Sequence, residues 1–204
     1  MKTDELTNTV EEYKKDQHVA SNHHDNDFLG DPRYEETPEH INETRKGDCY
    51  CEQEMDEYRR RHPLEQAIRC WKWGEKSRKH RHQWRVDNKS IDALTETALK
   101  RIAEIRRCKT FHDLFLLTQA IKPSGIGSLS TYDFALRVGM SLGLEPMYIY
   151  LHAGARIGAE NLLGEDKVNN RGYLCLEEIP EPLRYMEPYH IENFFCIHKD
   201  KKWA

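Results

Sequence analysis

The stretch Pro123-Ser124-Gly125-Ile126-Gly127-Ser128-Leu129-Ser130-Thr131 decides how we expect this chain to fold. It predicts a tight turn between two helices, because paired glycines allow a backbone path that side chains would block. Ile126, between the glycines, is expected to point inward and hold the turn against the flanking helices. The first amides of the next helix would then be exposed and unpaired, an arrangement that favours phosphate binding.

Helical patterns lie on both sides of this turn. Thr110 and Asp113 have the spacing of a capping box, and the apolar residues that follow predict a helix to about residue 121. After the turn, the apolar positions from 129 to 140 predict a second helix that ends near Gly143. The glycine turn is therefore expected to join two amphipathic helices.

Further helices are predicted on either side of this pair. Pro63 suits the first turn of one helix, and Ser90 is expected to cap a long one that continues to residue 105. Residues 146–151 are predicted to be helical and residues 164–172 to form a polar loop. Three prolines punctuate two short C-terminal helices, and Gly154 and Gly158 permit close helix packing. With no convincing strand alternation, the fold class is mainly α, a compact helical domain.

The net charge of −4 hides a strong division along the chain. Residues 1–56 hold 16 acidic against 6 basic residues, whereas residues 57–122 hold 8 against 17 and residues 123–204 hold 11 against 8. The first segment, which is acidic and poor in large apolar residues, predicts a disordered tail. We therefore expect a tail at 1–56 and a helical domain at 57–204, with a basic part at 57–122 and the hairpin and C-terminal helices at 110–204.

The composition also limits where the chain is expected to work. No apolar run approaches the roughly 20 residues that a membrane helix needs, and the N-terminus lacks the pattern of a signal peptide. The six cysteines are scattered, which favours reduced thiols. The sequence thus predicts a soluble, cytoplasmic protein that does not bind membranes. The acidic tail, or an apolar C-terminal helix at 191–197, is a candidate site for a protein partner.

Residues 110–142 resemble the helix-hairpin-helix unit of many DNA repair and recombination proteins. The resemblance lies in a first helix with Phe111, Leu114 and Leu117, the hairpin Gly125-Ile126-Gly127, and a second helix that opens Ser128-Leu129-Ser130-Thr131. The family often has a basic residue just after the hairpin, where this chain has Ser128 and Leu129. The resemblance implies that the hairpin amides, with the hydroxyl of Ser128 or Ser130, contact DNA phosphates without reading bases.

A second candidate binding segment runs from Trp71 to Arg85. It holds six Lys and Arg residues against one acid, with three tryptophans between them. Cations neutralise phosphates, and indole rings stack on bases, so this pattern favours nucleic-acid binding. The alternative is that Trp71 and Trp84 are core residues beside a solvated charged face. The candidate contacts in this segment are Lys72, Lys76, Arg78, Lys79, Arg81, Trp84 and Arg85.

Metal and catalytic patterns are weaker. Cys49-x-Cys51 and His80-x-His82 have one-residue gaps, which fit structural zinc poorly, so neither a metal nor a cofactor is predicted. The catalytic candidates are Tyr132, Asp133, His152 and Arg156. The alternative for the last two is a buried, hydrogen-bonded histidine and an arginine paired with an acid such as Asp133. Asp133 follows the hairpin too closely to match the catalytic Asp of helix-hairpin-helix glycosylases.

Three hypotheses follow from the sequence. The first is a non-enzymatic protein that binds nucleic acid, DNA in the first place, through the backbone and without strong sequence preference. The second is an enzyme that acts on nucleic acid, centred on Asp133, His152 and Arg156. The third is an adaptor that binds another protein, in which the glycine turn is only a corner of the fold.

Overall fold

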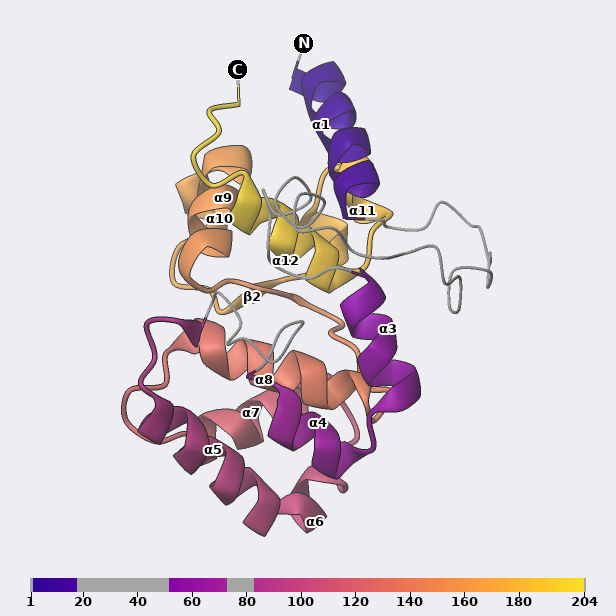
Figure 1. The fold of residues 1–204 in the computed structure, drawn as a ribbon. Coiled ribbons are helices and arrows are strands. Elements are labelled where there is room, and N and C mark those ends of the chain that lie inside the picture. The colour runs from indigo at the N-terminus through magenta and orange to yellow at the C-terminus, as the bar shows by residue number, and fades with distance from the viewer. Residues whose placement is uncertain (1, 18–51, 73–82, 204) are drawn as a thin grey trace.

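The computed structural model describes residues 2–17, 52–72 and 83–203 (Figure 1). Helices dominate these residues, which confirms the mainly α fold class. The helices before the middle of the chain are α1 (Lys2–Asp16), α3 (Glu52–Arg61), α4 (Leu64–Cys70), α5 (Asn88–Lys100), α6 (Ile102–Ile105), α7 (Phe111–Ile121) and α8 (Ser128–Met140). After them come β1 (Ile149–Tyr150), α9 (Ala153–Leu163), α10 (Glu165–Val168), β2 (Tyr173–Leu174), η4 (Leu176–Glu178), α11 (Glu181–Arg184) and α12 (Pro188–Ile197).

Helix α8 is the central element of the lower half in Figure 1. Every residue from 130 to 140 is buried, and α3, α4 and α7 pack against this helix. The preceding helix, α7, begins at the expected capping box: the Thr110 side chain accepts from the Asp113 amide, and the Asp113 carboxylate accepts from the Thr110 amide. The two helices expected on either side of the glycine turn are therefore confirmed as elements.

The upper half in Figure 1 is built on the pair α9 and α12. A Cβ atom placed on Gly158 of α9 would lie 2.0 Å from the carbonyl oxygen of Phe195, so only glycine permits this approach. This confirms the close packing expected there. Strands β1 and β2 pair antiparallel, with Ile149 opposite Leu174 and Tyr150 opposite Tyr173, and β1 also contacts α12.

Within the described residues, buried apolar side chains form two clusters. The first fills the space between α3, α4, α5, α7 and α8, and Trp71 is fully buried in it. The second joins α9, α11 and α12 with α1, which contributes Leu6, Val10 and Tyr13. Apolar residues of α12 such as Ile191, Phe194 and Phe195 are buried here, so the expected docking role of residues 191–197 is wrong for these side chains.

The N-terminal region departs from the sequence expectation in part. Residues 2–16 form α1, and α3 begins at Glu52, so these two parts of the predicted tail at 1–56 are helical. Helix α1 lies against α11, and its apolar residues are buried despite the acidic composition. Three apolar residues at helical spacing pack into the second core cluster, whose other members lie far away in the sequence, so the local composition does not reveal the contact. Residues 18–51 lie outside the described part of the chain.

Three local predictions are corrected. The long helix expected from 90 to 105 is interrupted at Arg101, whose φ of −105° and ψ of 20° are not helical, and Asp87 rather than Ser90 is its N-cap. Residues 149–150 form a strand instead of the end of a helix. The polar loop at 164–172 contains the short helix α10.

Candidate functional site

The glycine turn is held in place by the start of α5. Ser90 donates a hydrogen bond from its hydroxyl to the carbonyl oxygen of Ser124, at 3.0 Å. Gly125 has a φ of +89°, and a Cβ there would lie 2.6 Å from that same hydroxyl oxygen, so this position requires glycine. Ile126 is 2% exposed and belongs to the first core cluster, as expected.

The second glycine, Gly127, is the N-cap of α8 and is not sterically required to be glycine. Gly127 has extended backbone angles, and a Cβ on it would meet nothing within 4 Å. Among the described residues no side chain caps this helix, its first turn holds no acid, and Gly127 and Ser128 are exposed. Lys122 donates from Nζ to the carbonyl oxygen of Ile126 at 2.9 Å, which places a cation beside the turn. An exposed, uncapped helix N-terminus with a neighbouring ammonium is suited to an anion.

The other side of the turn carries a negative charge. The Asp87 carboxylate accepts a hydrogen bond from the Ser90 amide and shares the proton of the Ser90 hydroxyl with the Ser124 carbonyl, and it lies 3.4 Å from the position of a Cβ on Gly125. An anion is therefore disfavoured near Gly125 and favoured near Gly127. Ser130 is 3% exposed, so its hydroxyl cannot make the expected surface contact, which leaves Ser128.

The structure describes part of the basic aromatic segment. Trp84 is 68% exposed and Arg85 is exposed, next to the residues that contact the turn. Lys72 forms an ion pair with Asp92, so its charge is already balanced. Trp71 is a core residue whose indole donates to the Thr95 hydroxyl at 3.0 Å. Of the other sequence candidates, Lys76, Arg78, Lys79 and Arg81 lie outside the described residues.

Three of the four catalytic candidates come together inside the molecule. The rings of Tyr132 and His152 have centroids 4.8 Å apart, and Asp133 sits on the same helix as Tyr132. Asp133 accepts from the Gln83 amide nitrogen at 2.6 Å and lies 3.8 Å from the guanidinium of Arg137. These side chains are buried, and Tyr132 belongs to the first apolar cluster.

Sequence reasoning missed the carboxylate that faces His152. Glu192 of α12 places Oε1 at 3.1 Å from Nε2 of His152, and its side chain is 1% exposed. Burial lowers the pKa of His152, but the neighbouring Glu192 charge and hydrogen bond outweigh this, so the pKa is raised above 6.5. Burial also raises the pKa of Tyr132 well above its ordinary value. Glu192 lies between the apolar residues Ile191 and Phe194 of the C-terminal helix. A lone acid in such an apolar stretch is the sequence signal that could have indicated a buried partner for this carboxylate.

Arg156, the fourth catalytic candidate, does not contact the Asp133 carboxylate but lies against main-chain carbonyl groups around α10. Its guanidinium donates to the main-chain carbonyls of Val168, Leu151 and Arg171, so it ties the loop around α10 to α9. The expected pairing with Asp133 is wrong, because Arg137, one turn along α8, approaches that carboxylate instead. Arg156 therefore has a structural role.

The buried cluster shows no chemistry that is open to a substrate in this conformation. His152 is 6% exposed, and Asp133 and Tyr132 are not exposed at all. In the described ranges, no group of three or more His, Cys, Asp or Glu side chains could hold a metal ion. The two pairs considered for zinc, Cys49 with Cys51 and His80 with His82, lie outside these ranges.

Comparison with known proteins adds no relative. The chain matches no family model, and neither the curated proteins nor the solved structures give a significant match. Among residues 2–17, 52–72 and 83–203, no helix has the length and apolar character needed to cross a membrane.

Proposed function

We propose that this protein binds a nucleic-acid backbone, DNA in the first place, without catalysis and without strong sequence preference. The glycine turn and the start of α8 form one part of the interface. Trp84, Arg85 and Lys89 form the other part.

The hydrogen bond from Ser90 to Ser124 carries this proposal. It holds the start of α5 against the glycine turn, and the basic aromatic segment ends at Arg85, five residues before Ser90. Lys89 and Arg85 are exposed within a few residues of that contact. The basic residues and the glycine turn are thus both close to the start of α5.

Each part of this interface has a defined role. The amides at Gly127 and Ser128, with the Lys122 ammonium beside them, would donate to a phosphate oxygen. Lys89 and Arg85 would neutralise further phosphates and release counterions. The exposed indole of Trp84 would stack on an unpaired base or pack on a sugar. None of these contacts reads a base edge, which is why no strong sequence preference is expected.

An electrophoretic titration against single- and double-stranded DNA and RNA at two salt concentrations tests the proposal. The double variant Arg85→Gln with Lys89→Gln should bind every sequence more weakly. It should also lower the salt slope by about 2, since two phosphates would no longer be neutralised and each accounts for about one unit.

The matched control removes two exposed lysines far from the turn, Lys15→Gln with Lys202→Gln. It should leave affinity and salt slope close to those of the unaltered chain. Equal losses in the two variants would show only a general charge effect and would refute the interface. Absence of binding to any polynucleotide at low salt would refute the function.

One observation favours the second candidate, an enzyme acting on nucleic acid. Asp133, His152 and Glu192 gather in one buried cluster, and such clusters are common where pKa values are tuned for catalysis. Product formation that His152→Ala abolishes, with nucleic-acid binding retained, would establish it. Their nearly complete burial makes a structural role the better supported one, so the binding function stands first.

A further inference from the structure

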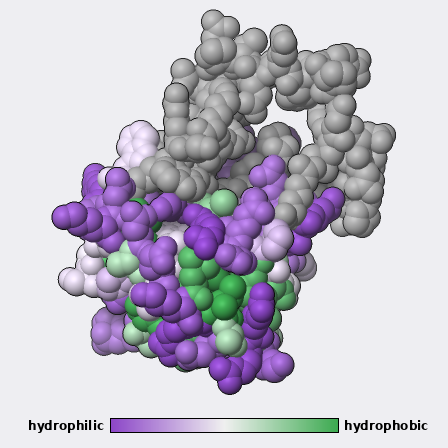
Figure 2. All heavy atoms as spheres, turned by 60° about the horizontal axis from the view of Figure 1, so that its bottom comes forward, coloured by the Kyte–Doolittle hydropathy of each residue, from purple (hydrophilic) through white to green (hydrophobic). Residues whose placement is uncertain are grey.

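We infer that the groove between α6 and α7 is a docking site for an acidic amphipathic helix of a partner protein. This inference is independent of the proposed nucleic-acid function, because it concerns another face of the molecule. Figure 2 shows this face, the bottom of Figure 1 turned forward: apolar residues gather at its centre and hydrophilic residues surround them.

The apolar centre comes from three neighbouring helices. Leu99 and Ile102 on α5 and α6 are only partly buried, as is Leu117 on α7, and Leu116 is 49% exposed. Mean hydropathy of the chain is −0.88, so aliphatic residues that remain partly or largely exposed stand out. A contiguous apolar patch with a polar rim is typical of a surface that binds another protein.

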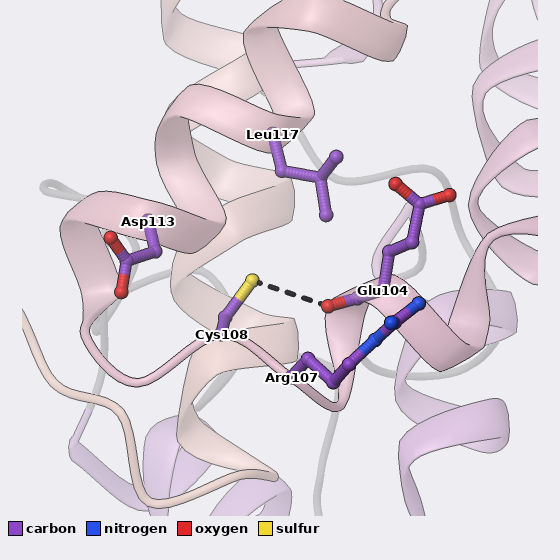
Figure 3. Close-up of a pocket in the computed structure, with 5 residues that line it drawn as sticks. All are labelled: Glu104, Arg107, Cys108, Asp113 and Leu117. Atoms are coloured by element: carbon purple, nitrogen blue, oxygen red, sulfur yellow. Dashed lines mark hydrogen bonds between the residues drawn. The ribbon is translucent and has the colours of Figure 1, made fainter.

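The groove has a pocket at one end. Leu117 and Cys108 line an open pocket of about 410 Å³ together with Glu104, Arg107 and Asp113. Figure 3 shows Leu117 pointing from α7 into the space above Cys108, whose thiol donates to the carbonyl oxygen of Glu104 at 3.6 Å. The pocket is open and mostly polar, with Leu117 as the one aliphatic side chain among its described lining residues, so a docked helix can set one aliphatic residue against Leu117 at its edge.

Charge identifies the kind of partner. Residues 99–121 hold five basic and two acidic residues. Both acids are engaged locally, because Glu104 bonds to Arg101 and Asp113 closes the capping box of α7. The next acid toward the start of α5 is Glu96, one turn before Leu99. A positively charged rim favours a negatively charged partner, because complementary charges steer association and fix the orientation of the partner. The exposed cations at the rim are Lys100, Arg106, Arg107 and Lys109.

The side chains at the centre of the groove favour a peptide over a polynucleotide as the ligand. Bases stack on aromatic rings or on Arg planes, whereas the centre of this groove is formed by leucine and isoleucine side chains. Aliphatic side chains at helical spacing on a partner helix fit such a centre. The proposed ligand is therefore a helix with Leu or Ile on one face and Glu or Asp on its flanks.

A displayed library of helical peptides, about four turns long, tests the inference on the full chain. Peptides are selected on the unaltered protein and then measured on Leu116→Asp, which should weaken their binding at least roughly tenfold. The enriched sequences should combine an aliphatic stripe with acidic residues. The variant Arg106→Gln with Arg107→Gln should weaken the same peptides several-fold at low salt.

Ile157→Asp is the matched control, because Ile157 is 47% exposed on α9, outside the groove. It should leave binding unchanged, and equal melting temperatures of Leu116→Asp and Ile157→Asp would exclude unfolding as the cause of a loss. Enrichment of no acidic amphipathic sequence, or equal binding to both variants, would overturn the inference. Loss of DNA binding in Leu116→Asp, with displacement of the peptides by DNA, would also overturn it, because the face would then be a nucleic-acid surface.

Discussion

Gly125 and Gly127 flank the same isoleucine but are under different steric constraints. Gly125 has a positive φ and touches Ser90, whereas Gly127 has extended angles and open space around it. The fold therefore needs a glycine at the first position and does not need one at the second. A substitution at Gly127 therefore tests the binding proposal well, because the fold does not require glycine there but close approach of a phosphate would.

We expect Gly127→Ala to fold as the unaltered chain does and to bind DNA more weakly. The added methyl group meets no protein atom within 4 Å, but it would hinder close approach of a phosphate to the amides of α8. Thermal unfolding and electrophoretic titration measure the two effects separately.

Gly125→Ala should instead lower the free energy of unfolding by about 1 kcal/mol or more, because alanine disfavours a positive φ. Unchanged DNA affinity in Gly127→Ala would exclude the amide contact.

A second residue-scale prediction concerns His152 and Glu192. Because the folded pKa of His152 is raised above 6.5, its contribution to stability is fully present below that pH and is lost as pH rises through the folded value. Each pKa unit is worth about 1.4 kcal/mol. The free energy of unfolding, measured in urea from pH 6 to pH 9, should therefore fall more steeply in the unaltered chain than in Glu192→Gln.

The difference between the two proteins isolates this pair from other histidines. Burial lowers the pKa of His198, so that residue acts in the opposite direction, but it does so in both proteins. Parallel pH profiles would show that the carboxylate does not hold the imidazolium.

At the scale of elements, the contact between α9 and α12 depends on the missing side chain of Gly158. We expect Gly158→Ala to lower the free energy of unfolding by about 1–3 kcal/mol, because the two helices must move apart. Chemical denaturation measures this loss. Gly172→Ala is the control, since a Cβ there meets nothing within 4 Å and should cost little. Equal free energies of unfolding for Gly158→Ala and Gly172→Ala would mean that α9 and α12 can move apart without a loss of stability.

The elements themselves differ in how well the sequence predicts them. Periodicity and capping chemistry place α4, α7 and α8, because those signals are local: Thr110 and Asp113 lie three residues apart. The break at Arg101 has no such signal, since the apolar stripe continues through it into α6. Strands β1 and β2 are two residues long, too short for any alternation to appear, and they exist because they pair with each other. Local patterns cannot reveal elements that depend on distant partners.

The candidate site shows the same division. The inward position of Ile126 follows from the turn itself, and so does the exposure of Gly127 and Ser128 after it. The approach of Ser90 and Asp87 to the turn does not, because it depends on how α5 packs against α7. Glu192 beside His152 is likewise a product of folding, since 40 residues separate them along the chain.

For the whole molecule, the attachment of α1 is the largest departure from the sequence prediction. Tyr13 is 3% exposed, accepts from the Asn193 amide nitrogen at 2.9 Å, and places its hydroxyl 3.1 Å from Nδ1 of His190. The first helix thereby becomes part of the second core cluster. An acidic composition does not prevent packing when a few apolar residues meet a prepared surface.

We expect Tyr13→Phe to lower the free energy of unfolding by about 1 kcal/mol, and Tyr13→Ala by about 3–5 kcal/mol. The first change removes the hydroxyl from its buried polar partners, and the second also removes the ring. Urea denaturation followed by circular dichroism measures both. Tyr185→Phe, at a position 77% exposed, should have no effect. If Tyr13→Ala were as stable as Tyr185→Phe, α1 would not be part of the core in solution.

Near its two ends the chain is held together, since Nζ of Lys201 lies 3.3 Å from Oε1 of Glu5. Figure 1 shows both ends at the top of the molecule, with α5 and α6 at the bottom. A tether attached at either end, to a sensor chip or a fluorescent fusion, would therefore leave the opposite pole accessible to large ligands. Immobilised protein should thus report the same affinities whichever end is anchored.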